Sequence, residues 1–395
     1  MKYDRSFFDT PVDRMGTNCE KWDALRRREG SDLLPMWVAD TDFQAPQPVV
    51  DAVVKRAQHP IYGYTFVVPE FQKVTVDWVK RRHGWEIQPE WLVFAAGVVP
   101  VMNTMAQIYS EPGDEIVIQQ PVYPQFANAV RDTGRVISDN GLLYKNGRYE
   151  IDFDDLERRA SSPKAKLMFF CNPHNPAGRV WTVEELKKVA EICLKHHIIL
   201  VSDEIHSDLI LFGHKHTPLA SLDKRYGEMT VTCYAPSKTF NTAGLRGSGI
   251  VVPNPEIRAK LEKQFKRNRA IQQNIFALPA YIAAYTECDD YLEQLLAYLE
   301  GNVLYIEEFL KEKMPKIRMV HPEATYLAWL DCSGTGMEGD ALADFFINRC
   351  KVAINRGDSF GPECKKFVRL NFGCPRITLE KGLGQIYAEY QRLFR

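Results

Sequence analysis

The fold of this chain is decided by the stretch that runs from Lys166-Leu-Met-Phe-Phe-Cys171 to Ile198-Ile-Leu-Val-Ser202, two apolar runs with an amphipathic segment between them. In that segment Thr182 and Glu185 have the spacing of a capping box, and apolar residues follow at helical intervals. The stretch therefore predicts a buried strand, a crossover helix from Thr182 to His197 and a second buried strand parallel to the first.

The same pattern continues on both sides of this unit. Glu115-Ile-Val-Ile-Gln119 and Thr230-Val-Thr-Cys-Tyr234 also read as buried strands, so residues 90–255 are predicted to form βαβ units around a mostly parallel sheet. Ligands of open α/β sheets bind outside the carboxyl ends of the strands, so the segments after these four strands should meet at one crevice. The predicted fold class is therefore α/β.

The pattern changes after about residue 285. Long amphipathic runs alternate there with short strand-like runs, which is typical of a smaller α+β lobe. The long runs are 291–311 and 340–350, and the short ones are 326–330 and 367–371. We expect a large domain over residues 46–285 and a small domain that combines residues 1–45 with residues 286–395. No linker is rich enough in Pro, Gly or Ser to act as a flexible tether, so the two should be rigidly joined.

Composition excludes several kinds of partner. The 50 Lys and Arg residues balance the 51 Asp and Glu residues, so a formal net charge of −1 supplies no field to hold nucleic acid or an anionic membrane, and we expect a small-molecule partner. The start lacks an apolar signal core and no 18-residue apolar run follows, which favours a cytoplasmic protein. The nine cysteines are odd in number and include no CxxC pair, so reduced thiols and no metal site are expected.

Lys238 is the first candidate for chemistry, because Ala235-Pro-Ser-Lys-Thr-Phe-Asn241 follows the end of a predicted strand. Taken alone, a lysine in such a loop is more often an ordinary solvated side chain. An amine that attacks an aldehyde must be deprotonated, and burial at the end of an apolar strand lowers the pKa of a lysine toward the range where this happens. The place of Lys238 in the predicted fold therefore favours a nucleophilic amine.

Three more polar side chains follow the other predicted strands. Asp203 needs a cationic partner at the crevice, such as a protonated pyridine nitrogen; the alternative is a carboxylate that caps a loop. Asn175, in Asn172-Pro-His-Asn-Pro-Ala-Gly178, is either plain turn chemistry or an amide donor aimed at a phenolic oxygen. Tyr123 is a candidate to stack on a flat aromatic ring, although a crevice tyrosine also serves as ordinary core.

A run of small residues in Ala95-Ala-Gly-Val-Val-Pro-Val101 marks a candidate anion site. Gly97, Val98 and Val99 begin a predicted helix that runs to about Tyr109, and small side chains let backbone N–H groups approach an anion at a helix N-terminus. Arg246, eight residues after Lys238, is a candidate partner for the same anion. A surface salt bridge is the alternative explanation for that arginine.

Taken together and in order, these residues resemble the class I/II aminotransferase superfamily, whose members are fold-type I enzymes that use pyridoxal 5'-phosphate (PLP). The likeness covers essentially the whole chain and implies a seven-stranded type of sheet in the large domain. It implies that Lys238 holds PLP as a Schiff base. The further cofactor contacts that it implies are Asp203 at the ring nitrogen, Asn175 and His206 near the ring oxygen, Tyr123 on the ring face, and Ser237, Arg246 and residues 97–99 around the phosphate end.

The resemblance also implies how substrate is bound. Arg369, in Phe367-Val-Arg-Leu-Asn371, matches the arginine that binds the substrate carboxylate, with Ala39 and Asn175 as further substrate contacts. Tyr64, in Tyr62-Gly-Tyr-Thr65, matches a catalytic-site tyrosine that reaches the phosphate of the neighbouring subunit. The match at Tyr64 implies a homodimer with shared active sites.

Within the superfamily, the chain looks most like the C–S lyase branch of MalY/PatB-type cystathionine β-lyases and cystalysin. His206 stands where aminotransferases usually have tyrosine. Four segments carry this likeness: Trp37-Val-Ala-Asp-Thr-Asp-Phe43, Ala96-Gly-Val-Val-Pro100, Ser202-Asp-Glu-Ile-His206 and Ala235-Pro-Ser-Lys-Thr-Phe-Asn241. The likeness implies β-elimination of cystathionine, cysteine or related S-substituted cysteines, with Lys238 as the base and Lys238 or Tyr123 as the acid.

Some positions depart from the family pattern. Ala235 stands where many aminotransferases have a phosphate-binding serine, and Val98 and Val99 replace hydroxyl residues, so phosphate binding is expected to depend on backbone amides, Tyr64 and Arg246. Gly373 and Cys374 have no assigned role. Two other functions stay open, an aminotransferase that uses the same carbanion and a regulatory binding protein that retains the fold.

Overall fold

The computed structural model describes residues 3–29, 32–268 and 273–394. Its central sheet has seven strands in the order β2-β10-β9-β8-β7-β3-β4, of which only β10 runs antiparallel to its neighbours. The strands are β2 (Leu92–Ala95), β3 (Glu115–Ile118), β4 (Val136–Asp139), β7 (Ala165–Cys171), β8 (Ile199–Asp203), β9 (Thr230–Tyr234) and β10 (Ser248–Val251). The predicted α/β class and the mostly parallel sheet are confirmed.

The predicted unit of strand, crossover helix and strand over residues 166–202 has the expected form. Strands β7 and β8 pair in parallel, and helix α8 (Val183–Lys195) connects them. The Glu185 N–H donates to Thr182 Oγ1 over 3.2 Å, and the Thr182 N–H donates to the Glu185 carboxylate over 2.8 Å. Both halves of the capping box therefore form, and the helix begins where its sequence predicts.

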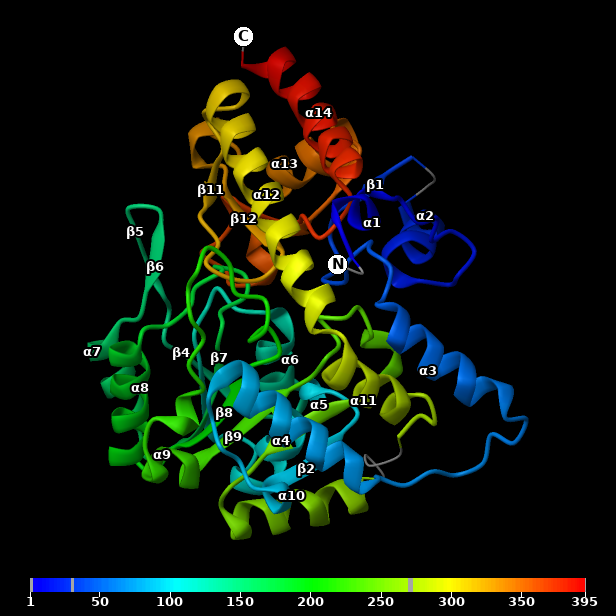
Figure 1. Cartoon of the computed structure of the whole chain (residues 1–395). Coiled ribbons are helices and arrows are strands. Elements are labelled where there is room, and N and C mark those ends of the chain that lie inside the picture. The colour runs from blue at the N-terminus through cyan, green and yellow to red at the C-terminus, as the bar shows by residue number, and fades with distance from the viewer. Residues whose placement is uncertain (1–2, 30–31, 269–272, 395) are drawn as a thin grey trace.

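Helices cover both faces of the large sheet (Figure 1). Phe169 of β7 packs in the core beneath α5, α6 and α10, whereas its neighbours Met168 and Phe170 pack in the core beneath α7 and α8, as the two-residue period of a strand requires. The helices of this part are α3 (Gln47–Gln58), α4 (Pro69–His83), α5 (Val98–Tyr109), α6 (Pro124–Asp132), α7 (Phe153–Ala160), α8, α9 (Lys224–Met229), α10 (Pro255–Arg267) and α11 (Ala277–Glu287).

A second, antiparallel sheet has the order β11-β12-β15-β14 and lies with α12, α13 and α14 at the top of Figure 1. The predicted helix over 340–350 is a short α-helix followed by a π-helical turn at Phe345–Arg349. These elements are α12 (Asp289–Lys313), β11 (Arg318–Val320), β12 (Leu327–Asp331), α13 (Gly339–Asp344), β13 (Val352–Ala353), β14 (Asn355–Arg356), β15 (Phe367–Asn371) and α14 (Arg376–Leu393).

The N-terminal residues lie against the C-terminal part. Strand β1 (Leu34–Pro35) pairs in parallel with β13, and helix α1 (Arg5–Asp9) contacts α12. Helix α2 (Leu25–Glu29) lies between α1 and β1 in the sequence. A hairpin of β5 (Leu143–Lys145) and β6 (Arg148–Glu150) extends from the other side of the molecule in Figure 1. The domain boundaries at residues 46 and 286 stay a prediction. Within the described parts of the chain, no helix is long and apolar enough to cross a membrane.

The carboxyl ends of β3, β7, β8 and β9 lie on one edge of the sheet, because these four strands are parallel neighbours. Strand β2 also ends on that edge, since its last residue, Ala95, pairs with the first residue of β10. The expected convergence of the segments after the strands is therefore confirmed.

Gly178 joins the loop after β7 to the C-terminal part. Its carbonyl oxygen accepts from the Glu323 and Ala324 N–H groups over 2.8 and 3.0 Å. It has a φ of +65°, and a Cβ on it would lie 2.9 Å from Pro322 Cα. A side chain at this position therefore meets both backbone strain and a backbone atom that cannot turn aside.

Gly178→Ala should lower the free energy of unfolding by at least about 2 kcal/mol, because the backbone strain at a positive φ and the steric overlap with Pro322 both destabilise the variant. Gly84→Ala is the matched control, since Gly84 has a φ of +69° and open space around its Cβ position. The control should cost about 1 kcal/mol from the backbone strain alone. Urea unfolding of both variants measures the difference, and equal losses would contradict the steric contact at Pro322.

Candidate active site

The predicted crevice is a cavity of about 450 Å³ at the edge where the strands end. Its walls include residues from every segment that the sequence singled out after the strands. The predicted site residues that line it are Ala39, Gly97, Val98, Val99, Tyr123, Asn175, Asp203, His206, Ser237, Lys238 and Arg246. The fold thus brings together eleven side chains and backbone segments that lie as much as 207 residues apart, from Ala39 to Arg246.

The Lys238 amine lies half-buried in this cavity. Its Nζ donates to Ala39 O over 2.6 Å. Burial and the positive charge of Arg369 lower the pKa of Lys238 from 10.5 to about 8, although Asp40 and Asp203 act in the opposite direction. The amine is therefore much easier to deprotonate than a solvated lysine, as its place after β9 predicts.

Asp203 ends β8 and is buried below the cavity. Its Oδ1 accepts from the Ile205 N–H over 3.2 Å, and no ion-pair partner lies within 4 Å of it among the residues described. Burial raises the pKa of Asp203 from 3.8 to about 6. A buried carboxylate without a counter-ion is costly, so this site favours a ligand that brings a positive charge to Asp203.

His206 lies beside Asp203 in the same loop and is also buried. Burial first, and then the positive charges of Lys238 and Arg369, lower the pKa of His206 from 6.5 to about 3. The imidazole is thus neutral at physiological pH, and it lines the cavity as a hydrogen-bonding group without charge.

Arg369 lies behind Asn175 rather than in the cavity wall itself. Its Nη1 donates to Asn175 Oδ1 over 3.1 Å, and its Nη2 donates to Trp37 O and Asn355 Oδ1 over 3.1 and 2.8 Å. In the part of the chain that the structure describes, the buried Nε has no hydrogen-bond partner, and no carboxylate forms an ion pair with the guanidinium. A buried cation with spare donors is suited to a carboxylate ligand.

The bond from Arg369 also orients Asn175. Because the amide oxygen of Asn175 accepts from Arg369, its NH2 group remains available to the cavity. The Asn175 carbonyl accepts from the Tyr123 N–H over 3.1 Å, so the loops after β3 and β7 hold each other. Burial raises the pKa of the half-buried Tyr123, which therefore keeps its phenolic proton.

The anion site predicted at residues 97–99 is the N-terminus of α5. Gly97 is its N-cap with a φ of 144°, a conformation that favours glycine, and no side chain caps the helix. Arg246 lies exposed at the rim of the cavity with a φ of 55°. The first turn of α5, whose N–H groups have no partners within the helix, and Arg246 thus both line the same cavity.

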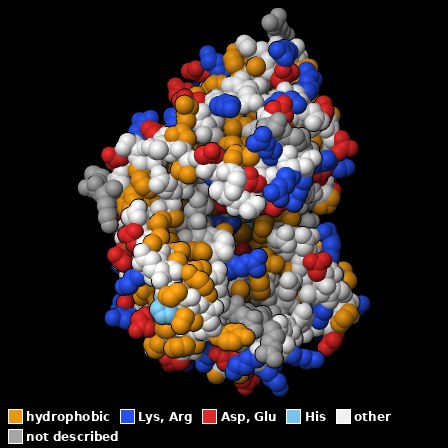
Figure 2. Space-filling model, turned by 90° about the vertical axis from the view of Figure 1, so that its right-hand side faces the viewer, with side chains coloured by type: hydrophobic (Ala, Val, Ile, Leu, Met, Phe, Trp, Pro, Cys, Tyr) orange, Lys and Arg blue, Asp and Glu red, His pale blue; other side chains and the backbone are white. Residues whose placement is uncertain are grey.

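Tyr64 is not brought to the cavity of its own chain. It is 106% exposed, in a segment between α3 and α4 where Ile61, Tyr62 and Phe66 are also largely exposed. Its predicted place in a neighbouring subunit stays a prediction. Figure 2 looks onto the side of the molecule where α3 lies in Figure 1, and hydrophobic side chains gather on that face.

Four residues at the site have roles that the sequence motifs did not reveal. Trp37 and Asn355 hold Arg369, Cys171 lines the cavity, and Tyr326 donates to Ala39 O over 3.0 Å. Trp37 lies in a segment used only for its likeness to the C–S lyases. Asn355 and Tyr326 follow no motif. Asn355 is revealed only by its pairing with Arg369 in the small sheet, and Tyr326 only by its place directly before Leu327, which pairs with Asn371.

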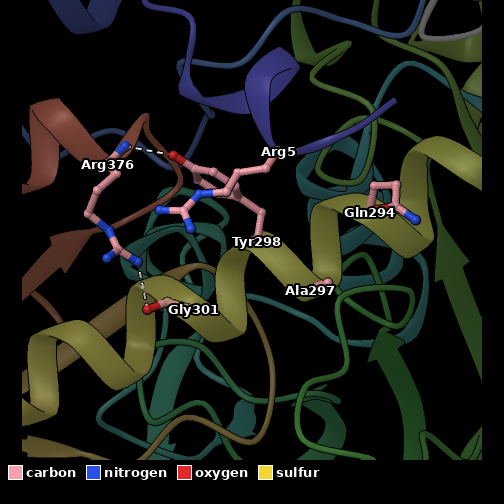
Figure 3. A pocket seen from close by; sticks show the side chains of 6 residues that line it. All are labelled: Arg5, Gln294, Ala297, Tyr298, Gly301 and Arg376. Atoms are coloured by element: carbon pink, nitrogen blue, oxygen red, sulfur yellow. Dashed lines mark hydrogen bonds between the residues drawn. The ribbon is translucent and has the colours of Figure 1, made fainter. Parts of the chain in front are cut away.

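A second cavity of about 420 Å³ lies between α1, α12 and the start of α14 (Figure 3). Arg376 donates to Gly301 O and Asn302 Oδ1, and Arg5 pairs with Asp9, so protein groups already bind both arginines. Its lining is Arg5, Gln294, Ala297, Tyr298, Gly301 and Arg376, which includes neither a carboxylate nor an available amine. We assign chemistry only to the cavity around Lys238.

The arrangement of lysine, carboxylate, amide and arginine at the strand ends is that of a PLP enzyme of fold type I, and the match to known families agrees. The family model "Aminotransferase class I and II" matches residues 37–386. The chain therefore belongs to the class I and II aminotransferase family, as its motifs predict.

More particular relatives lie in the C–S lyase branch. Cystathionine beta-lyase PatB of Bacillus subtilis is 44% identical over 382 residues, which are 96% of this chain and 99% of that one. Protein MalY of Escherichia coli is 33% identical over 95% of this chain and 96% of its own length. The crystal structure of cystalysin from Treponema denticola, which contains a pyridoxal 5'-phosphate cofactor, has a TM-score of 0.94 at 34% identity and covers 100% of both chains. The predicted resemblance to this branch is confirmed.

Reductive methylation of the protein freed of PLP should modify Lys238 with a midpoint near pH 8, below the usual value of 10.5. The deprotonated amine reacts, so the rate should rise as the pH rises through this midpoint. Arg369→Gln should move the midpoint upward, because the charge that disfavours the ammonium is removed. Mass spectrometry of the Lys238 peptide measures both profiles. A wild-type midpoint at the usual value would contradict the burial of the amine.

Proposed function

We propose that this chain is a PLP-dependent carbon–sulfur β-lyase that converts cystathionine, cysteine or related S-substituted cysteines to a thiol, pyruvate and ammonia. The observation that carries the proposal is the identity of 44%, over 96% of the chain, with a relative named cystathionine beta-lyase. The site supports it with a lysine of lowered pKa and a buried carboxylate that line one cavity, and with a buried arginine that bonds Asn175 in the cavity wall.

The residues of the cavity fit PLP. Asp203, buried without a counter-ion, is suited to a protonated pyridine nitrogen, and Asn175 has an amide NH2 to offer a phenolic oxygen. The start of α5 and Arg246 offer backbone N–H groups and a guanidinium to a phosphate. Lys238 supplies the amine for the aldehyde. We assign Tyr123 to the ring face and His206 and Ser237 to the walls around the cofactor.

Substrate binding depends on Arg369. Its free Nε and remaining N–H donor bind the α-carboxylate, while Trp37 O, Asn355 and Asn175 hold the guanidinium in place. Arg369 brings the positive charge that a carboxylate needs, and the neighbouring His206, with a pKa of about 3, is neutral. A carboxylate held by Arg369 orients the substrate Cα toward the cavity.

Lys238 then moves the proton. When bound, PLP withdraws electrons and so stabilises the negative charge that forms at the substrate Cα. The Lys238 amine, with a pKa of about 8, accepts the Cα proton near neutral pH and can return it to the departing sulfur. Tyr123, whose raised pKa keeps its phenolic proton, is the second candidate acid.

The overall reaction consumes one water. The Cβ–S bond breaks with its electron pair on sulfur, and the sulfur takes a proton to leave as a thiol. Water then replaces the amino group of the remaining three-carbon unit, which gives pyruvate and ammonia. No oxidant or reductant is needed. An aminotransferase would use the same first proton transfer, which is why the family match alone does not separate the two activities.

We also propose that the enzyme is a homodimer in which Tyr64 completes the site of the partner subunit. Ile61, Tyr62, Tyr64 and Phe66 are 67%, 60%, 106% and 72% exposed. Four large apolar or aromatic side chains in six residues, on a face where further hydrophobic side chains gather (Figure 2), are typical of a protein interface. The proposal accounts for a tyrosine that matches the site motif and yet lies outside its own cavity.

Incubation with cystathionine and PLP, without a keto acid, should release pyruvate, ammonia and homocysteine in equal amounts. Lys238→Ala should lower the rate at least about a hundredfold and abolish the visible absorbance of bound PLP, because the base and the attachment point are lost together. Lys73→Ala, on the exposed side of α4, is the control. Amino transfer to a keto acid without pyruvate would identify an aminotransferase instead. Bound PLP with neither product would favour a regulatory protein.

Mixing Tyr64→Ala with Lys238→Ala should restore activity that neither variant has alone. In a mixed dimer one site has Lys238 from one subunit and Tyr64 from the other, so unfolding and refolding an equal mixture should give about a quarter of the wild-type rate. Pyruvate formation measures this, and Leu304→Ala, also on an exposed side chain, replaces Tyr64→Ala in the control mixture. A mixture as inactive as its components would contradict the shared site.

A further inference from the structure

The hydroxyl of Tyr326 is a buried polar group that the scheme above does not use. Tyr326 lies directly before β12 and is 0% exposed. Its Oη donates to Ala39 O over 3.0 Å, and the same oxygen accepts from Lys238 Nζ over 2.6 Å. One carbonyl oxygen therefore receives two donors, one from the small sheet and one from the reactive amine.

The peptide groups next to Ala39 are held as well. Asn371 Nδ2 donates to Val38 O and to Asp40 O, over 2.6 Å in each case. Asn371 is itself held, because its Oδ1 accepts from the Gly373 N–H over 2.8 Å. The carbonyl of Ala39 thus projects from a fixed segment, and of its two acceptor positions Tyr326 takes one and leaves the other to Lys238.

The Tyr326 ring is also fixed against the site. It packs edge-on against His206, with ring centroids 6.1 Å apart and planes at 74°. Its own carbonyl oxygen accepts from the Phe372 N–H over 2.9 Å, which ties it to the end of β15. Burial raises the pKa of Tyr326, so the hydroxyl remains a donor across the physiological range.

We propose that Tyr326 is a positioning residue that holds the Ala39 carbonyl as the docking point of the Lys238 amine whenever the amine is not bonded to the cofactor. The inference rests on the proposed function, since it concerns the amine in its role as a base. With one N–H on a fixed acceptor, the amine keeps a fixed direction for its lone pair toward the cavity. A base that is already held in the reactive orientation transfers a proton faster than a base that must first adopt this orientation.

Tyr326→Phe tests the role of the hydroxyl, because it keeps the ring and its contact with His206. Tyr291→Phe is the matched control. Tyr291 is likewise buried and donates to a backbone carbonyl, Gln44 O, over 2.9 Å. Its ring packs against Phe240, two residues after Lys238, but Tyr291→Phe keeps that ring contact and removes only a hydroxyl that bonds neither Ala39 nor Lys238. Melting curves of both variants check that the fold is kept to a similar degree.

The first measurement is the rate at which the protein freed of PLP takes the cofactor up again, followed by the absorbance of attached PLP. Tyr326→Phe should be slower by about fivefold, as expected for one lost hydrogen bond that orients the amine. Tyr291→Phe should stay within about twofold of the wild type. A rate for Tyr326→Phe equal to that of the control would overturn the proposal.

The second measurement is the turnover of cystathionine with deuterium at Cα. In Tyr326→Phe, kcat should fall about fivefold while KM changes less than about twofold, because Arg369 and Asn175 are untouched. The isotope effect on kcat should increase, since removal of the Cα proton becomes slower than the other steps. A purely structural role would lower the melting temperature and leave the isotope effect unchanged.

The two proposals fail in different ways. Wild-type protein that takes up PLP but forms no pyruvate overturns the lyase function, and the uptake rates still decide the role of Tyr326. Wild-type protein that forms pyruvate while Tyr326→Phe matches Tyr291→Phe in uptake rate and isotope effect overturns only the role of Tyr326. Protein that takes up no PLP overturns both.

Discussion

The parallel pairing of β9, β8, β7 and β3 is the constraint on which the site depends. Each of these neighbouring strands ends on the same edge of the sheet, where Asp203 is the last residue of β8 and the loops after β9, β7 and β3 carry Lys238, Asn175 and Tyr123. Backbone hydrogen bonds set the spacing of parallel strands at about 4.8 Å, so four loops on adjacent strands have to share one cavity. An antiparallel arrangement of the same strands would send alternate loops to opposite edges.

Asp203 at this edge and Arg369 behind Asn175 are both buried, and neither has a counter-ion within 4 Å among the residues that the structure describes. Asp203 has a pKa of about 6 and Arg369 one of about 10, in both cases because burial disfavours the charged form. For Asp203 the shift corresponds to about 3 kcal/mol of lost stabilisation of the carboxylate, which a bound cation can recover. Binding energy is thus available where the cofactor and the substrate carboxylate are expected, while the pKa of Lys238, about 8, makes its amine easier to deprotonate than a solvated lysine.

The site also requires the small sheet. Arg369 and Asn371 lie on β15, and Tyr326 directly precedes β12. One antiparallel pair thus presents the arginine that we propose binds the carboxylate, together with the groups that hold residues 38–40. The loop at residues 321–325 binds back to the large sheet through Gly178, close to Asn175. Hydrogen bonds therefore join the residues around the cavity of the large sheet to residues of the small sheet.

The sequence by itself determined the α/β class, the four strands, the crossover helix with its capping box, and most of the cavity lining. The strands, the helix and the residues at the strand ends depend on local periodicity, so they can be read from short stretches of chain. Ala39, His206 and Ser237 were predicted only from the resemblance to the C–S lyases and the wider superfamily. Tertiary structure alone decided that Trp37, Asn355 and Tyr326 hold Arg369 and the Ala39 carbonyl, and that Tyr64 faces outward. Such contacts join residues up to 332 positions apart through backbone carbonyls and sheet register, and neither leaves a pattern in the side-chain sequence.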